Sequence, residues 1–304
     1  MSMKVKVEDI HKISQQLGAP GSLDLEPFLQ CKDHSVSRET FTLFRDRKRD
    51  LLVTVPQPSE ENLPSYYESE DYISHTDAKR NLIEKIYHQV RKHSLKKKEK
   101  LVTRVNQGTG KILDLGCGTG DFLKVCEESG WSIAGVEPND KARELAEAKT
   151  NMKEYHENIE DLIAAESGSF DVVTLWHVLE HIPDVAELIK KIQRILKPDG
   201  VLIVAVPNFK SVDAAHYGSE WAAYDVPRHL WHFSRKSIES IFAEFDMKIM
   251  EVLPMVFDSF YVSLLSQKYK TGKQNYLEAF YQGLRSNLKA RQSGEYSSLI
   301  YLIK

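Results

Sequence analysis

The stretch that decides the fold is Ile112-Leu113-Asp114-Leu115-Gly116-Cys117-Gly118-Thr119-Gly120. The pattern is typical of a short buried strand, a glycine-rich turn and the start of a helix. Glycine adopts positive φ angles without strain and lets the backbone approach a ligand closely. Ligands of open parallel sheets bind beyond the C-terminal ends of the strands, where this turn would lie. The stretch therefore predicts an α/β fold with a ligand at the turn.

The segments on either side of this turn alternate between strands and helices. We expect a helix over 76–101, then strands at 111–115, 132–137, 153–157, 170–176 and 201–206, with helices between them. After a loop at 208–232, a helix at 234–244 and two further strands at 248–253 and 297–303 follow. Right-handed crossovers then give a doubly wound, mostly parallel sheet with helices on both faces. A helical insert at 258–290 separates the last two strands and could cover the acceptor pocket or form a dimer face. Its aromatic residues at helical steps favour core packing over ligand contact.

Two carboxylates indicate which ligand the turn binds. The spacing is GxGxG, whereas dinucleotide folds use GxGxxG to seat a pyrophosphate on a helix N-terminus. Asp114 stands two residues before the first glycine, where a carboxylate suits a cation better than a phosphate. Glu137 ends the second strand and can accept both hydroxyls of a ribose. S-adenosylmethionine carries an ammonium, a sulfonium and a ribose. The alternative is that both carboxylates are solvated and the glycines only form a turn.

Three motifs in this order resemble those of class I S-adenosylmethionine-dependent methyltransferases over residues 65–304. They are the segments 114–120, 172–181 and 197–202, the second of which contains His-Val-Leu-Glu-His. The resemblance implies a seven-stranded sheet of order 3-2-1-4-5-7-6 with the last strand antiparallel. It also implies S-adenosylmethionine as the cofactor and S-adenosylhomocysteine as the product.

The same resemblance implies the cofactor-binding residues. Asp114, Gly116 and Gly118 would line the methionine part of the cofactor, and Glu137 would hold the ribose. Pro138 would lie against the adenine, with Asn158 or Glu160 near its amine, although Asn158 also suits a helix cap. The remaining expected cofactor contacts are Cys117, Gly120, Ile159, Tyr67, His75, and Trp176 with His177 as the floor under the sulfonium. The aromatic stretch that contains Tyr67 and His75 could instead be a hydrophobic staple.

The methyl acceptor is expected to meet the loop after the fifth strand, which is unusually rich in histidine and aromatic residues. The predicted acceptor-site residues are His216, Tyr217, Trp221, Tyr224, Arg228 and His229. Since histidine titrates near neutral pH, His229 is the candidate general base, with a structural, hydrogen-bonded histidine as the alternative. Glu180 and His181 are expected to orient the loop. No metal is predicted, because the spacing of these histidines matches no familiar ligand set.

Bulk composition narrows the class of protein. The chain has 304 residues, a formal net charge of −3 and 41% hydrophobic residues, which gives no sign of a polyanionic partner or a membrane surface. No apolar stretch reaches the roughly 18 residues needed to span a bilayer. We therefore expect a cytoplasmic monomer or homodimer, with no nucleic acid, that methylates an oxygen or nitrogen of a small-molecule, sugar or lipid-like acceptor. The alternatives are an NAD-dependent Rossmann oxidoreductase and a non-catalytic S-adenosylmethionine-binding protein.

Residues 1–64 are expected to form a small, largely irregular extension in which 41–44 and 51–55 could be two short strands. The segment resembles a zinc-binding knuckle found before some methyltransferase domains, in which pairs of cysteines bracket a hairpin. Only Cys31 is present here, and one thiolate cannot build a tetrahedral zinc site. The sequence therefore predicts a degenerate, zinc-free hairpin.

Overall fold

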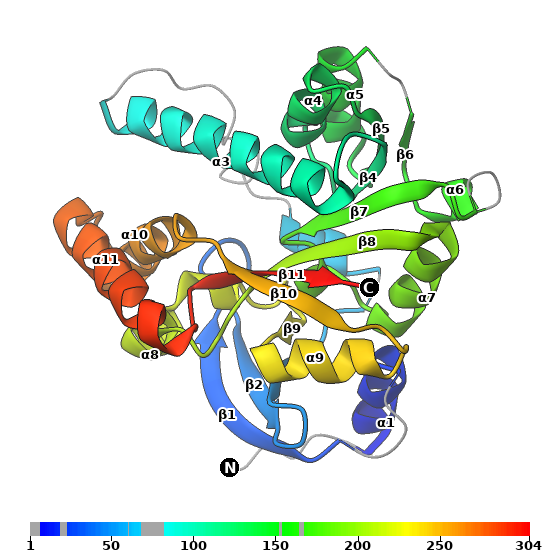
Figure 1. Cartoon of the computed structure of the whole chain (residues 1–304). Helices are drawn as coiled ribbons and strands as arrows, with labels where there is room; N and C mark the ends of the chain where they lie inside the picture. The colour runs from blue at the N-terminus through cyan, green and yellow to red at the C-terminus, as the bar shows by residue number, and fades with distance from the viewer. Residues whose placement is uncertain (1–6, 19–22, 60, 68–81, 152–153, 164–166) are drawn as a thin grey trace.

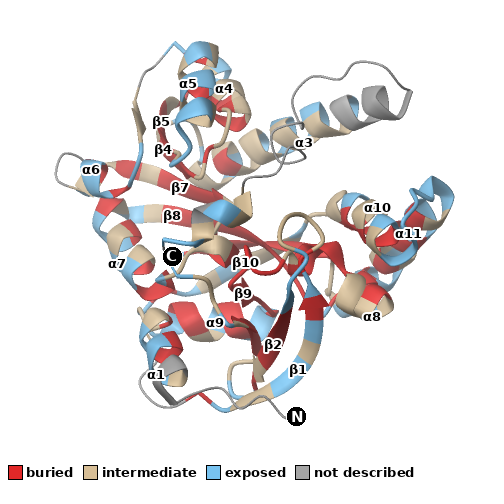
Figure 2. Cartoon of the chain, turned by 180° about the vertical axis from the view of Figure 1, so that it is seen from behind, coloured by how far each residue is buried: buried red, intermediate tan, exposed pale blue. Residues whose placement is uncertain are grey.

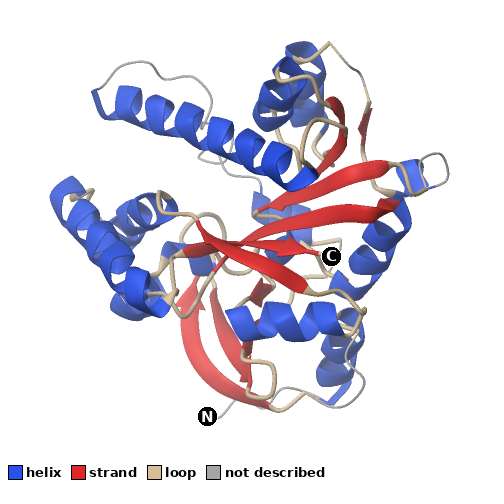
Figure 3. Cartoon of the chain, viewed as in Figure 1, coloured by secondary structure: helices blue, strands red, loops and turns tan. Residues whose placement is uncertain are grey.

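A seven-stranded sheet forms the centre of the molecule (Figures 1 and 3). The computed structural model describes residues 7–18, 23–59, 61–67, 82–151, 154–163 and 167–304. The order of the strands across the sheet is β10-β11-β8-β7-β4-β5-β6. Their bounds are β4 Lys111–Leu115, β5 Ser132–Val136, β6 Tyr155–His156, β7 Phe170–Trp176, β8 Leu196–Pro207, β10 Ile249–Pro254 and β11 Ser298–Ile303.

The pairing of the strands confirms the predicted topology. The strands β6, β5, β4, β7 and β8 run parallel, whereas β11 is antiparallel to both of its neighbours, β8 and β10. Numbered in chain order, these seven strands give 3-2-1-4-5-7-6. The strand expected at 201–206 is longer than predicted, because β8 begins at Leu196, and its pairing with β7 is irregular between Phe170 and Val172.

Alternating side chains of the strands fill two hydrophobic layers, as expected for a sheet covered on both faces. Along β8, Val201, Ile203 and Ala205 face the layer formed with α3 (Leu82–Asn106) and α4 (Asp121–Glu128). Leu202, Val204 and Val206 face the opposite layer. The helices on that side are α1 Val7–Gln16, α6 Glu160–Ile163, α7 Val185–Ile195 and α9 Arg235–Ala243. Complete burial of one aliphatic side chain stabilises the folded chain by about 1.5–3 kcal/mol. The continuous apolar runs therefore favour strands that are buried on both faces at the centre of the sheet.

Side-chain caps begin three of the helices around the sheet. Asn139 accepts a hydrogen bond from the Ala142 amide at the start of α5 (Asp140–Lys149), and Asp184 accepts one from the Glu187 amide. Ser234 forms a capping box with Ser237 at the start of α9. These bonds satisfy amides that the helix itself leaves unpaired.

The N-terminal segment is more regular than expected. It contains α1 and three antiparallel strands, β1 (Leu25–Lys32), β2 (Thr40–Asp46) and β3 (Leu51–Val55). The fourth strand of this small sheet, β9 (Trp231–His232), comes from the loop after β8 and pairs with β3. That loop also folds into α8 (Val212–Tyr217) and two 3-10 turns, η3 (Gly218–Glu220) and η4 (Ala222–Tyr224). The extension and the post-β8 segment therefore share one core.

The helical insert is a hairpin of α10 (Asp258–Thr271) and α11 (Tyr276–Ser293) that projects to one side of the sheet (Figure 1). We refer to residues 258–293 as the α10–α11 hairpin. The expectation that its large apolar residues pack into the core is wrong for most of α11. Figure 2 shows that α11 has both buried and exposed positions. Its buried face carries small and polar side chains, while large apolar residues are exposed: Leu277, Phe280, Tyr281, Leu284 and Leu288.

Candidate active site

The glycine loop after β4 uses glycine at its three positions for two different reasons. Gly116, Gly118 and Gly120 have φ angles of 69°, 54° and 76°. A Cβ on Gly116 would lie 2.5 Å from Val178 Cγ2, and one on Gly120 would lie 2.8 Å from Ala146 Cβ. A Cβ on Gly118 would meet no described atom within 4 Å. Gly116 and Gly120 thus permit tight packing, whereas Gly118 leaves space for a ligand.

Glu137 is held against this loop by backbone amides. Its Oε2 accepts a hydrogen bond from the Gly118 amide at 2.9 Å, and its Oε1 accepts one from the Asn139 amide at 2.9 Å. The carboxylate therefore lies at the ends of two neighbouring parallel strands, β4 and β5. This position fits a carboxylate that exchanges an amide partner for ribose hydroxyls.

Asp114 lies buried near the end of β4. The Thr174 hydroxyl donates a hydrogen bond of 2.6 Å to its Oδ1. Burial raises the pKa of Asp114 to about 7, and the Thr174 bond and the Lys98 ammonium only partly oppose this effect. A buried carboxylate of this kind gains more from a cationic ligand than a solvated one does, because its own hydration is already lost.

Lys98 on α3 and Trp176 at the end of β7 meet beside this carboxylate. The Lys98 ammonium lies over the Trp176 ring, 4.2 Å from its centre, and the ring packs edge-on against Phe122. Burial lowers the pKa of Lys98, while Asp114 and Asp258 act in the opposite direction. The Trp176 ring, which the resemblance places under a sulfonium, therefore already holds one cation on its aromatic face.

His177 is held by two carboxylates and has a φ angle of 59°. Its Nε2 lies 2.9 Å from Asp258 Oδ2, and its Nδ1 lies 3.4 Å from Glu180 Oε1. Burial alone would lower the pKa of His177, but Asp258 and Glu180 raise it to about 9. The ring is therefore protonated at neutral pH and forms an ion pair with the first residue of α10.

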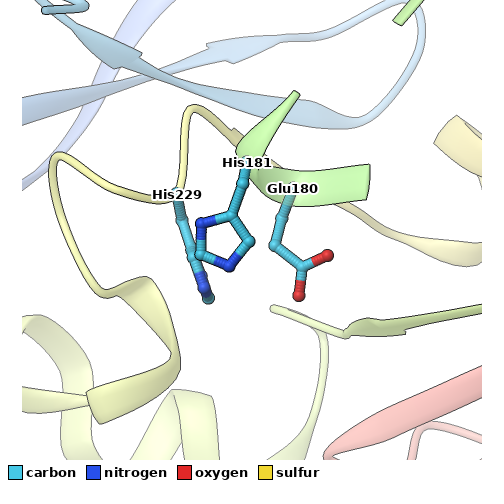
Figure 4. Close-up of side chains that lie close together, drawn as sticks. All are labelled: Glu180, His181 and His229. Carbon is cyan, nitrogen blue, oxygen red and sulfur yellow. The ribbon is translucent and has the colours of Figure 1, made fainter. Parts of the chain in front are cut away.

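Glu180, His181 and His229 form a buried cluster whose ligand atoms all lie within 4.8 Å of one another (Figure 4). His229 Nδ1 bonds the Ala223 carbonyl at 2.9 Å, and His181 Nδ1 lies 3.1 Å from the Arg228 carbonyl. Carbonyl oxygens only accept hydrogen bonds, so the Nδ1 of each ring is the donor in these contacts, and the neutral form of either ring has its unprotonated nitrogen at Nε2. Among the described residues, neither oxygen of Glu180 receives a hydrogen bond of good geometry.

Burial, followed by the neighbouring His229, lowers the pKa of His181 to about 4, so that ring is neutral at pH 7. Two imidazole nitrogens and one carboxylate could accept a proton or hold a divalent cation. In metal sites, ligating histidines usually donate their second nitrogen to a backbone carbonyl, as both rings do here.

The aromatic residues predicted to form the acceptor wall lie mainly in the core. Trp221, Tyr224 and Tyr217 are buried together with residues of β1, β2 and β3. Trp221 donates its indole hydrogen to Asp213 at 2.8 Å. His216 is half-buried and packs edge-on against Tyr217. These contacts explain the bulky composition of the loop by packing, and a role in acceptor binding stays a prediction.

Arg228, another predicted acceptor residue, is committed to structural contacts. It bonds both oxygens of Asp225, at 2.9 Å and 2.6 Å, and the Tyr66 carbonyl at 3.0 Å. Its remaining contact is Asp33 Oδ1 at 3.1 Å, in the N-terminal extension. Arg228 therefore joins the extension to the loop after β8.

The other predicted cofactor residues lie around the same edge of the sheet. Pro138 and Asn158 are exposed, and Asn158 accepts a bond from the Asp161 amide as a helix cap. Ile159 is buried in the main core and Cys117 in the α3–α4 layer. The Tyr67 hydroxyl oxygen lies 3.0 Å from His181 Nδ1 and accepts from the same N–H as the Arg228 carbonyl. His75 lies outside the described residues. The cofactor contacts of all these residues remain predictions.

Three residues of the site were missed from the sequence: Lys98, Thr174 and Asp258. Lys98 stands in a run of three lysines that favours a solvated helix face. Asp258 lies more than a hundred residues after the glycine loop. In the sequence it looks like one of the acidic residues that commonly begin helices. Thr174 carried a usable signal, because a lone hydroxyl in a strand of apolar residues needs a buried partner.

An apolar cavity of about 360 Å³ opens beside these residues, between α3 and the β10–α10 connection. Its walls include Leu101, Leu253, Met255 and Phe257, with Lys98 and Asp258 at one side. Since Lys98 contacts Trp176 and Asp258 contacts His177, the cavity adjoins the end of β7. It offers an apolar molecule a place next to the candidate cofactor site.

Comparison with known proteins agrees with this geometry. The profile of a methyltransferase-domain family matches residues 86–252, more than half of the chain, so the chain belongs to that family. This membership confirms the predicted class and supports S-adenosylmethionine as its cofactor.

Curated relatives include the ubiquinone biosynthesis O-methyltransferases of Actinobacillus pleuropneumoniae and Thiobacillus denitrificans. They are 32% and 33% identical over 136 and 135 residues, which is 41% of this chain in each case. The matches span 58% and 57% of those relatives, little more than half of their length.

Solved structures with a similar fold include a methyltransferase from Archaeoglobus fulgidus, with a TM-score of 0.47 and 18% identity over 74% of this chain and 100% of that one. A geranyl diphosphate C-methyltransferase from Streptomyces coelicolor has a TM-score of 0.48 and 15% identity, covering 68% and 75%. Within the described residues, no helix is both long and apolar enough to cross a membrane.

Proposed function

We propose that the protein transfers the methyl group of S-adenosylmethionine to a hydroxyl oxygen of a small molecule with an apolar part. The observation that carries the proposal is the buried Asp114 carboxylate at the end of β4, next to a glycine loop whose Gly118 faces open space. The curated relatives, named as O-methyltransferases, favour oxygen over nitrogen as the acceptor atom.

The cofactor supplies an activated methyl group, and the protein must align it and exclude water. Asp114 would balance the positive charge of the donor, and Glu137 would take its ribose hydroxyls. The Trp176 ring would lie under the sulfonium. These three side chains come from the ends of β4, β5 and β7, which are adjacent in the sheet.

An oxygen acceptor must lose its proton as it attacks, so a base is required. One ring nitrogen of His181, one of His229 and a carboxylate oxygen of Glu180 lie within 4.8 Å of one another. We assign the proton-accepting role to His229, whose ring is oriented by its bond to the Ala223 carbonyl. The apolar cavity between α3 and the β10–α10 connection is the proposed entrance for the acceptor.

Thermal shifts with S-adenosylmethionine, S-adenosylhomocysteine and NADH test the donor site. The first two ligands should raise the melting temperature, and NADH should not, since only ligands that bind the folded state stabilise it. Formation of S-adenosylhomocysteine with a panel of phenols then separates an enzyme from a non-catalytic binding protein. A shift with NADH alone would favour the oxidoreductase instead.

The alternative role of this cluster is metal binding, because two imidazole nitrogens and one carboxylate lie within 4.8 Å of one another. A divalent cation held by Glu180, His181 and His229 would lower the pKa of a bound hydroxyl. We expect turnover to survive exhaustive chelation, because His229 can accept the proton directly. Loss of turnover that Mg²⁺ or Zn²⁺ restores would assign the cluster to metal binding instead.

A further inference from the structure

The α10–α11 hairpin leaves an apolar stripe largely exposed, with the Phe260 ring of α10 stacked on one of its members, Phe280. Leu277, Phe280, Tyr281, Leu284 and Leu288 follow one another at spacings of three, one, three and four residues, which places them on one side of α11. We call these five residues the α11 stripe. Of the ten large apolar residues exposed in the described part of the chain, seven lie on the hairpin.

The orientation of α11 is the reverse of that of an ordinary surface helix. Ala279, Gln282, Gly283, Ser286 and Ala290 face the protein, where Ser286 donates to Asp213 and Gly283 packs closely on Phe260. Helices of soluble domains usually bury their large apolar residues instead. An exposed apolar face of this kind marks an interaction surface.

The charge around the stripe indicates what covers it. The hairpin carries six basic and two acidic residues, a net charge of +4 in a chain whose overall charge is −3. Lys268, Lys270 and Lys273 surround the hairpin turn beside Leu277, and Lys289 and Arg291 lie near the other end of α11. All five of these basic residues are exposed.

We propose that the α10–α11 hairpin docks the protein on an anionic lipid bilayer, with the α11 stripe inserted among the headgroups. Helices that lie in a membrane interface combine an apolar face with basic residues, and tyrosines favour the interfacial level. An isologous contact between two copies would bring two positively charged hairpins together. Charge complementarity therefore favours an anionic surface over a second copy.

The hairpin also begins at the candidate active site. Its first residue, Asp258, lines the apolar cavity and pairs with His177. Docking through α11 would therefore place that cavity close to the bilayer surface, where an apolar acceptor would be concentrated. This consequence rests on the proposed function, whereas the docking itself does not.

Flotation with vesicles of phosphatidylcholine, with and without 40 mol% phosphatidylglycerol, tests the proposal at about 0.1 M and 0.5 M salt. The full-length protein should float with the anionic vesicles at low salt and dissociate at high salt. It should show little association with the neutral vesicles. Absence of binding, or equal binding to both vesicle types, would overturn the proposal.

Two double variants locate the surface. Leu277→Glu with Leu288→Glu, at side chains 85% and 50% exposed, should reduce binding to anionic vesicles by roughly tenfold or more. Met250→Glu with Leu145→Glu, at 64% and 47% exposed outside the hairpin, adds the same charge and should change binding by less than about threefold. Equal losses in both variants would overturn the assignment.

Sedimentation velocity tests the alternative that a second copy of this chain covers the α11 stripe. A dimer that the stripe variant dissociates, together with no vesicle binding, would assign the surface to a second copy. Because vesicle binding needs no methyl donor, failure of the docking proposal would leave the proposed transfer reaction untouched, and the reverse also holds.

Discussion

His177 Nε2 lies 2.9 Å from Asp258 Oδ2, and this ion pair joins the end of β7 to the first residue of α10. The two residues belong to segments far apart in the chain, yet together they connect the candidate active site to the helical hairpin. A histidine that both Asp258 and Glu180 hold in its charged form also gives the stability of the protein a pH dependence.

Asp258→Asn should flatten that dependence. The folded pKa of His177, about 9, is above its ordinary value of 6.5, so its stabilisation is complete below pH 6.5 and lost as the pH rises to about 9. The wild type should therefore lose about 1–2 kcal/mol of unfolding free energy over this range, and the variant less. Urea unfolding at pH 6.5 and 9 measures this. Equal losses in both proteins would show that His177 is not charged by Asp258.

Asp114→Asn should abolish donor binding while stabilising the donor-free protein. The pKa of Asp114 is about 7 in the folded protein, above its ordinary value of 3.8, so the wild type is progressively destabilised as the pH rises from about 4 to 7. The amide avoids this cost, about 2–4 kcal/mol at pH 8. The melting temperature at pH 8 should rise without ligand, and the shift with S-adenosylhomocysteine should vanish. A retained shift would contradict the assigned site.

Gly116→Ala and Gly118→Ala form a matched pair in the glycine loop. Alanine at 116 collides with Val178 and should cost about 2–4 kcal/mol of stability. Alanine at 118 meets open space and should cost only about 1 kcal/mol for its positive φ angle. The second variant should nevertheless bind the donor about tenfold more weakly, because its methyl group occupies ligand space. Calorimetric titration and urea unfolding measure the two effects, and unchanged donor affinity in Gly118→Ala would move the site elsewhere.

Arg228→Lys tests whether Arg228 stabilises the fold or binds the methyl acceptor. Lysine cannot reproduce the forked contacts with Asp225 and Asp33, so stability should fall by about 2–4 kcal/mol. At a temperature where both proteins are folded, the KM for the acceptor should change by less than about threefold. A large rise in KM with little loss of stability would restore the acceptor role that the sequence suggested.

Much of the central sheet could be predicted from the sequence, because its strands are buried on both faces and appear as continuous apolar runs bounded by turns. The N-terminal sheet could not be predicted in full. Its last strand, Trp231–His232, has two residues and acquires its conformation only by pairing with β3. Local periodicity carries no information about such a partner.

The candidate site also has parts that could be predicted from the sequence and parts that could not. Asp114, the three glycines and Glu137 are neighbours through the topology of adjacent strands, so their proximity could be inferred from spacing. The ion pair of His177 with Asp258 depends on where the α10–α11 hairpin lies relative to the sheet. The periodicity of the sequence does not reveal that position. The periodicity of α11 is likewise identical whether its apolar side faces the core or the solvent. The net charge of −3 for the whole chain also hides the net positive charge of the α10–α11 hairpin.

The pairing of β3 with β9 determines how the chain can be divided. A shortened protein starting at residue 65 would leave Trp231 on an unprotected edge and uncover Trp221, Tyr224 and Arg228, which now pack on the first three strands. The segment that holds His229 would lose the surface against which it folds. The first 64 residues are therefore part of the scaffold of the candidate base, and we expect residues 65–304 joined to another N-terminal segment to lose activity.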